Sequence, residues 1–74
     1  AAMDVIVLGQ CKTIREGYAI FQFSGYWRDQ KIKQIRVRSS HCWKREGEYI
    51  LQLKVTRLED KVLWTKLIRA KLFD

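Results

Sequence analysis

Apolar and polar residues alternate along most of this 74-residue chain with the period of two that is typical of β-strands. The apolar stretches are rich in β-branched and aromatic residues, and short polar or glycine-containing turns separate them. The pattern predicts five strands, near residues 4–13, 18–27, 31–38, 48–57 and 61–72. The segment from Ser39 to Gly47 begins with residues that cap helices, so one short helical turn is expected there.

Five strands with closely spaced turns and almost no helix predict an all-β fold, a small five-stranded antiparallel Greek-key barrel. Closure into a barrel removes the exposed sheet edges that favour aggregation. An OB-fold and an SH3-like barrel both match this length, and the short first loop favours the OB-fold. Residues 3–74 are expected to form one domain, because so short a chain cannot build two cores. Ala1 and Ala2, before Met3, are typical of residues left by an expression tag.

The alternation also predicts which side chains point into the barrel. If Phe21 and Phe23 face the core, then Ala19 faces it too. The same reasoning places further residues inward, namely Ile35, Val37, Tyr49, Leu51, Leu53 and Val55. The outward residues of the second and third strands are Ile20, Gln22, Ser24, Gln34, Arg36 and Arg38, with Tyr18 and Tyr26 at the ends. Gly9 in mid-strand implies a bulge or a sharp coil of the sheet, and a break in phase is expected between Trp64 and Ile68.

Charge points to the class of partner. Lys and Arg number 15 against 8 Asp and Glu, which gives a formal charge of +7 and predicts attraction to polyanions, nucleic acid first. A hydrophobic fraction of 47% excludes a disordered basic tail. No predicted helix is long enough to lie in a major groove, so a single strand is favoured over a duplex. Stacking aromatics and phosphate-binding cations are then the candidate binding residues: Tyr18, Ile20, Gln22, Tyr26, Trp27, Lys31, Gln34, Arg36, Arg38, Lys54, Lys66 and Arg69.

The three tryptophans carry different expectations. Trp27 lies next to the predicted hairpin tip and is either a stacking platform for a base or a cap on the core. Trp64 is expected in the core. Trp43 is expected to plug one end of the barrel, with Lys44 and Arg45 reaching solvent.

Catalytic and metal-binding patterns are missing from the sequence. Cys11 and Cys42 lie 31 positions apart without the paired spacing of a zinc site, and they are expected to be reduced thiols in a cytoplasmic protein. His41 is the only histidine and has no nucleophile or carboxylate at motif spacing. No stretch approaches the roughly 20 apolar residues of a membrane span. We therefore expect no enzyme activity, metal, cofactor, small-molecule substrate or membrane partner.

Two segments resemble OB-fold nucleic-acid-binding domains at the superfamily level. Val5-x-Val7-x-Gly9-x-Cys11, followed by residues 14–23, resembles the first hairpin of these domains. The segment Gly47-Glu48-Tyr49-x-Leu51-x-Leu53 resembles the opening of their fourth strand. The resemblance spans nearly the whole chain and implies non-enzymatic binding of single-stranded nucleic acid. The chain departs from larger single-strand-binding proteins in lacking an extended connection between the third and fourth strands and an acidic tail.

Three functions stay open at this point. The leading one is binding of single-stranded DNA, or of RNA, alongside replication, recombination or translation proteins. The second is a protein-interaction barrel that docks an acidic partner around an apolar centre formed by Ile20 and Tyr26. The third is a structured-RNA or ribosome-associated factor, which would prefer folded RNA to homopolymers.

Overall fold

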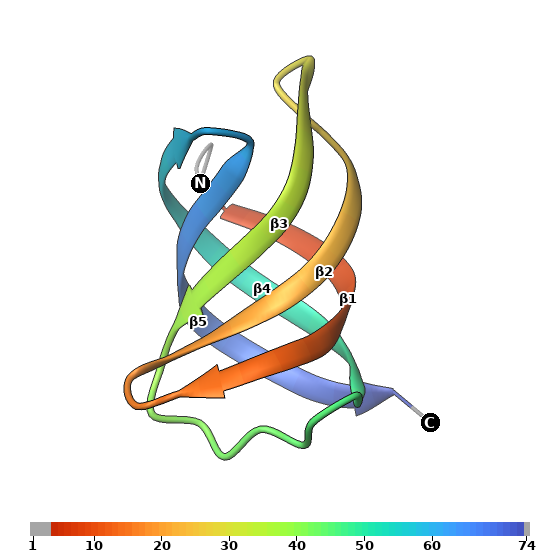
Figure 1. Cartoon of the computed structure of the whole chain (residues 1–74), viewed down its shortest axis with the longest axis vertical. Helices are drawn as coiled ribbons and strands as arrows, with labels where there is room; N and C mark the ends of the chain where they lie inside the picture. Colours follow the sequence, from red (N-terminus) through yellow and green to blue (C-terminus); the bar gives the residue numbers. More distant parts are fainter. Residues whose placement is uncertain (1–3, 74) are drawn as a thin grey trace.

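Five strands make up the fold, which we describe from a computed structural model over residues 4–73 (Figure 1). The strands are β1 (Asp4–Arg15), β2 (Tyr18–Trp27), β3 (Gln30–Arg38), β4 (Glu48–Glu59) and β5 (Val62–Phe73). All five predicted strands are confirmed, and β1 and β4 each continue two residues further than expected. The alanine pair at the start lies outside the described residues. Residues 4–73 contain no helix that is long and apolar enough to cross a membrane.

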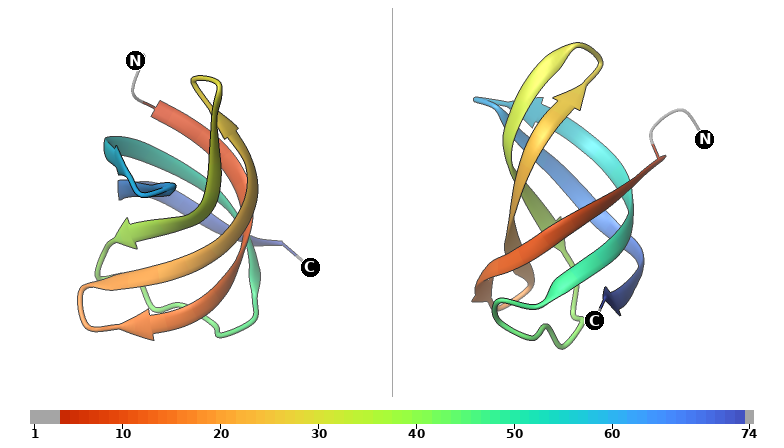
Figure 2. Two further views of the ribbon diagram at one scale, coloured as in Figure 1. Left: turned by 45° about the horizontal axis from the view of Figure 1, so that its top comes forward. Right: turned by 90° about the vertical axis from the view of Figure 1, so that its right-hand side faces the viewer.

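The strands close into a barrel in the order β1-β2-β3-β5-β4 (Figures 1 and 2). Four neighbouring pairs are antiparallel, and β3 and β5 run parallel, so the predicted five-stranded barrel is confirmed as a mostly antiparallel one. The parallel pair results from the path of residues 39–47, which carry the chain across one end of the barrel and place β4 against β1. The hairpin from β4 then brings β5 to β3 in the same direction. This all-β architecture is consistent with an OB-like or an SH3-like barrel.

Tight two-residue turns connect the strands of the β2–β3 and β4–β5 hairpins. The central residues of the β2–β3 turn, Arg28 and Asp29, have φ of 50° and 64°. The β4–β5 turn repeats this arrangement at Asp60 and Lys61, with φ of 54° and 64°. Two consecutive positive φ values give the turn a twist that matches the right-handed twist of the strands, so each hairpin closes with only two residues.

The helical turn expected between residues 39 and 47 is not observed, and that prediction is wrong. The segment crosses the barrel end without regular secondary structure and turns at Arg45 and Glu46. One backbone hydrogen bond closes the turn within the segment, from the Gly47 N–H to the Lys44 carbonyl at 3.0 Å. Two others join the segment to β1: Cys11 donates its N–H to the Gly47 carbonyl at 2.9 Å, and Glu46 donates to the Cys11 carbonyl at 2.7 Å. The bonds to β1 engage the Glu46 N–H and the Gly47 carbonyl, so these groups do not form hydrogen bonds within a helical turn.

The inward prediction is confirmed for most residues. Ala19 and Phe21 are fully buried, and so are the predicted positions on β3 and β4: Ile35, Val37, Leu51, Leu53, Val55 and Tyr49. Phe23 is only half-buried, because the β2–β3 register shifts between Gln22 and Gly25 and turns its ring over Gly25. Phe21 is therefore the last fully buried residue of β2, whereas the alternation predicts that Phe23 is buried as well.

Trp43 closes the end of the barrel, as predicted. Its side chain is buried, and its ring meets Phe21 edge-on at 4.9 Å and Tyr49 at 5.0 Å. The Tyr49 hydroxyl accepts a hydrogen bond from the Lys44 backbone N–H at 2.7 Å, which fixes the crossing segment above this aromatic cluster. Lys44 and Arg45 are exposed.

Register shifts occur at places that the sequence marks only in part. Of the two alternatives expected at Gly9, the bulge is not observed: Gly9 keeps its register with Tyr49, and the shift in β1 falls between Cys11 and Thr13. The predicted phase break in β5 is confirmed, because Ile68 is skipped between two paired neighbours. A further shift, between Val55 and Arg57 of β4, changes the face presented at the site described next.

Candidate nucleic-acid interface

Side chains on the outside of β2, β3, β5 and β4 line up in rows, because directly opposed residues of neighbouring strands point to the same side of a sheet. We call the first of these the cationic row: Tyr18, Arg38, Lys66 and Lys54. The second, two positions along each of β2, β3 and β5, is the aromatic row: Ile20, Arg36, Trp64 and Arg57. A third, mostly polar row follows, made of Gln22, Gln34, Val62 and Glu59.

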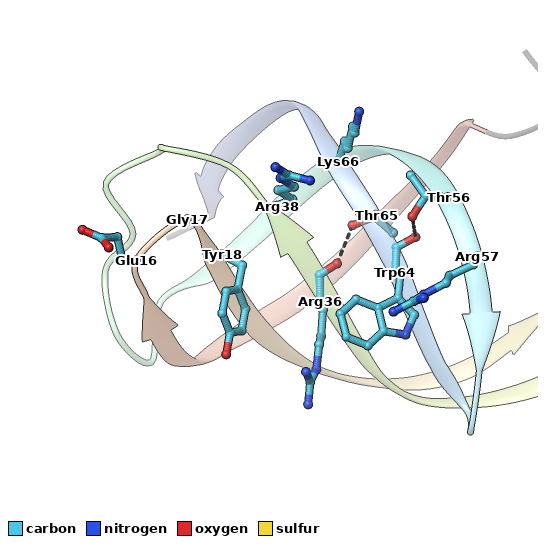
Figure 3. A pocket seen from close by; sticks show the side chains of 10 residues that line it. All are labelled: Glu16, Gly17, Tyr18, Arg36, Arg38, Thr56, Arg57, Trp64, Thr65 and Lys66. Atoms are coloured by element: carbon cyan, nitrogen blue, oxygen red, sulfur yellow. Dashed lines mark hydrogen bonds between the residues drawn. The ribbon is translucent and has the colours of Figure 1, made fainter.

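A groove of about 690 Å³ runs over the first two rows. Its lining includes both rows' central residues, as Figure 3 shows: Tyr18, Arg36, Arg38, Arg57, Trp64 and Lys66, with Glu16, Gly17, Thr56 and Thr65 around them. In this view the side chains of Tyr18 and Arg36 point the same way, and Arg57 reaches across to the Trp64 indole. We call this cavity the basic groove.

Trp64 lies at the centre of the aromatic row, so its expected place in the core is wrong. Its neighbours Leu63 and Thr65 are buried, and strand alternation therefore directs Trp64 outward, where it is half-buried. The Arg36 guanidinium carbon lies 4.8 Å from the indole centroid, and that of Arg57 lies 4.3 Å from it. Both distances are typical of cation–π contacts. Lys66, two residues further along and already a candidate binding residue, is the sequence signal for the same orientation of Trp64.

Arg57 joins the groove because of the register shift in β4. Val55 is buried, and uninterrupted alternation would have pointed Arg57 into the barrel as well. The shift places both Thr56 and Arg57 on the outside, and Arg57 then lies opposite Trp64. Its guanidinium also stays 4.0 Å from the Glu59 carboxylate. No periodic pattern in the sequence could have assigned this arginine to the site.

Two threonines hold the strands that carry the aromatic row. Thr65 is buried and donates its hydroxyl to the Arg36 carbonyl at 2.9 Å, which ties β5 to β3. Thr56, which is exposed, donates to the Trp64 carbonyl at 3.0 Å and ties β4 to β5. The Arg36 side chain is oriented in turn by its Nε, which donates to the Gln34 side-chain oxygen at 3.1 Å. Side-chain hydrogen bonds therefore connect β3, β5 and β4, the three strands that carry Arg36, Trp64 and Arg57.

Electrostatic repulsion is built into the cationic row. Arg38 lies directly opposite Lys66, and Lys66 lies directly opposite Lys54, so like charges meet across two successive strand pairs. Such pairs destabilise a sheet. Within residues 4–73 neither Arg38 nor Lys66 forms an ion pair, and Glu16 is the one acidic residue lining the groove. The row thus presents positive charge that an external anion can neutralise.

The structure brings together part of the predicted site. Four predicted residues line the groove, and four more lie in the same three rows: Tyr18, Arg36, Arg38 and Lys66, then Ile20, Gln22, Gln34 and Lys54. The remaining four lie elsewhere. Tyr26, Trp27 and Lys31 belong to the far end of the β2–β3 hairpin, and Arg69 lies opposite Gln52 beyond the phase break.

Those outlying positions also bear on other expectations. Trp27 is half-buried and packs against the core, with the Arg28 guanidinium 4.6 Å from its ring centroid, and it does not line the basic groove. Ile20 and Tyr26 lie six residues apart on β2, about 20 Å along a strand, and do not form the single apolar centre that the protein-interaction hypothesis requires.

The groove offers cations, planar side chains and hydrogen-bond donors. Among residues 4–73 no group of three or more His, Cys, Asp or Glu side chains is placed to hold a metal ion. His41 is exposed and packs 4.4 Å from the Trp43 ring, away from the groove. Both cysteines are free: Cys42 is exposed, and burial raises the pKa of the Cys11 thiol. What the groove can do is bind an anion that also carries flat groups.

Comparisons with known proteins add no further assignment. The chain matches no protein-family model, and no curated protein or solved structure is similar enough to count as a match. The geometry of the basic groove is therefore the ground on which its function is inferred.

Proposed function

We propose that this chain is a non-enzymatic protein that binds single-stranded nucleic acid, with single-stranded DNA as the favoured ligand, in the basic groove. The observation that carries the proposal is the adjacency of the cationic and aromatic rows within one groove. The strand order supports an OB-like barrel in preference to an SH3-like one. OB-fold barrels bind oligonucleotides on the face of their second and third strands, and β2 and β3 contribute half of each row here.

The two rows match the two chemical faces of a single strand. They are two residues apart along the strands, about 6.5 Å, so a phosphate backbone that follows Arg38 and Lys66 places its bases over the aromatic row. There the Trp64 indole and the guanidinium planes of Arg36 and Arg57 provide stacking surfaces. A duplex hides the faces of its bases, so it can use only the cationic row. Single-stranded ligand is accordingly preferred.

Charge reversal in the cationic row tests the proposal. The probe is a fluorescein-labelled thymidine oligonucleotide of about 12 nucleotides, within the usual range for one OB-fold. Fluorescence anisotropy is measured between about 50 and 200 mM NaCl. Arg38→Glu with Lys66→Glu removes two phosphate contacts, which weakens binding and lowers the magnitude of the log affinity against log salt slope by roughly 1.4. Both side chains are exposed, so the barrel keeps its fold.

Lys44→Glu with Arg45→Glu is the matched control, because it changes net charge by the same amount on exposed residues outside the groove. This pair of changes leaves most of the affinity intact if the groove is the site. Equal weakening by both double variants would show that binding follows net charge alone. Absence of binding by the unmodified protein at the lowest salt would contradict the proposal outright. A duplex and an RNA of the same length, measured in parallel, rank the ligand classes.

A further inference from the structure

One edge of β1 is left without a neighbouring strand. The β1–β2 pairing begins only at Gln10 and Gln22, so residues 4–9 of β1 pair with β4 alone. On the other side, residues 25–27 of β2 pair with β3 alone. Figure 2 shows β1 and the β2–β3 hairpin separating toward this end of the barrel. Alternate backbone N–H and C=O groups of residues 4–9 therefore point away from β4, toward a position where a strand could add.

An apolar groove of about 390 Å³ lies along this edge. One wall consists of four consecutive residues of β1, Val5 to Leu8, and the other of Phe23, Tyr26 and Trp27. Because successive side chains of a strand point to opposite faces, a groove lined by four in a row runs along the strand's edge. We call it the edge groove; its lining contains no charged side chain.

The surface beside the edge groove is unusually apolar. Ile6 is 73% exposed, Leu8 is 50% exposed, and Leu8 lies opposite Ile50, which is 39% exposed. Tyr26, on the other wall, is 70% exposed. Soluble proteins protect open strand edges with charges, prolines or bulges. Residues 5–8 have none of these, which indicates that a partner strand covers the edge.

The distribution of charge identifies the partner. Residues 5–11 are uncharged, and residues 17–27 contain no Lys or Arg, although the chain carries a formal +7. Nucleic acid and acidic peptides are drawn to the cationic row, in which Arg38 and Lys66 lie on β3 and β5, the two strands of the barrel that do not neighbour β1. A second copy of the chain, by contrast, can approach the edge groove with its own cations directed outward. Each of the two copies then contributes the same uncharged apolar edge, as a two-fold interface requires.

We propose that two copies of this chain associate through the β1 edge at residues 4–9, antiparallel and related by a two-fold axis. The two β1 strands pair along the edges that face away from β4 and join the barrels through one continuous sheet, β4-β1 of one copy with β1-β4 of the other. Ile6 and Leu8 of both copies are covered together. The basic grooves remain open on the far sides, so this inference is independent of nucleic-acid binding.

Sedimentation equilibrium tests the association. We expect twice the mass of the 8.9 kDa chain at high protein concentration, with dissociation on dilution. Added NaCl strengthens the dimer, because it screens the repulsion between two basic molecules while the contact itself is apolar. Oligonucleotide binding weakens with salt, so failure of one proposal is distinguishable from failure of the other. Amide hydrogen exchange gives an independent readout: protection of residues 4–9 should rise with protein concentration.

Ile6→Lys should weaken the dimer by at least about tenfold, because a two-fold interface feels the change twice. The side chain is mostly exposed in the single chain, so circular dichroism should be unchanged. Ile68→Lys is the matched control, since Ile68 is also exposed but belongs to β5, two strands from the edge. A single-chain mass at every concentration would overturn the proposal. So would equal weakening by both variants, or concentration-dependent protection elsewhere than residues 4–9.

Discussion

At the scale of single residues, Trp64 shows how one position can serve both the fold and the binding surface. Its ring is half-buried, packs against two guanidinium groups and forms the centre of the basic groove. The indole N–H has no hydrogen-bond partner among residues 4–73 although it is buried. A buried donor without an acceptor costs free energy. The ring therefore contributes contact area and a π face, and not a hydrogen bond.

Trp64→Ala should weaken binding of the thymidine oligonucleotide by about 1–3 kcal/mol and leave its salt dependence nearly unchanged, because stacking involves no counterion release. Fluorescence anisotropy at several salt concentrations measures both quantities. Phe73→Ala is the control, an exposed aromatic residue outside the groove, and it should have little effect. A Trp64 variant whose salt slope falls together with its affinity would show that the two arginines, and not the indole, contact the ligand.

At the scale of strands, the parallel pair β3–β5 joins strands that are not consecutive along the chain, and it is the pair on which the groove depends. The other four pairs are antiparallel, and three of them join strands that are consecutive along the chain. Parallel pairing is slightly less stable per residue. The Thr65 hydroxyl adds a side-chain bond to the Arg36 carbonyl across this pair, where it also fixes the backbone of the aromatic row.

Thr65→Val keeps the shape of the side chain but removes that hydrogen bond. The free energy of unfolding should fall by about 1–2 kcal/mol, because a buried acceptor loses its partner. Urea denaturation followed by circular dichroism measures the change. Thr56→Val is the matched comparison: its hydroxyl bonds the Trp64 carbonyl, but the residue is exposed, so water replaces the bond and the loss stays below about 0.5 kcal/mol. Equal losses in the two variants would mean that burial of Thr65 plays no part.

Local patterns predicted the strands, the inward residues and most of β2–β3, because alternation and turn chemistry act within a few residues. The errors fall where pairing is decided between distant segments. Trp64 was assigned inward on its apolar character, although Lys66 shares its face. Arg57 reached the groove through a register shift that only the pairing of β4 with β5 creates. Phe23 left the core through a similar irregularity between β2 and β3.

At the scale of the whole molecule, the cationic row and the uncharged apolar edge lie on different parts of the barrel. The cationic row crosses β3, β5 and β4, whereas residues 5–11 of β1 are uncharged and strongly apolar. Under the two proposals above, this separation gives one small barrel two surfaces whose binding responds to salt in opposite directions. It also places Arg38, Lys66 and Lys54 where like charges face one another across strands. The arrangement that we propose attracts a polyanion is therefore one that lowers the stability of the folded protein.

Lys66→Gln should raise the stability of the fold and lower its affinity for the oligonucleotide. Lys66 faces Arg38 on one side and Lys54 on the other, so removing its charge relieves two cross-strand repulsions. At low ionic strength the variant should be more stable than the unmodified protein by a few tenths of a kcal/mol up to about 1 kcal/mol, and about 1 M salt should largely abolish the difference. Its affinity for the thymidine oligonucleotide should fall at the same time. Thermal unfolding and anisotropy at matched salt measure the two effects.

Arg69→Gln is the control: it removes the same charge from the same strand, but Arg69 lies opposite Gln52. If that variant gained as much stability, relief of net charge would be the cause; with no such gain, the repulsion is specific to the cationic row.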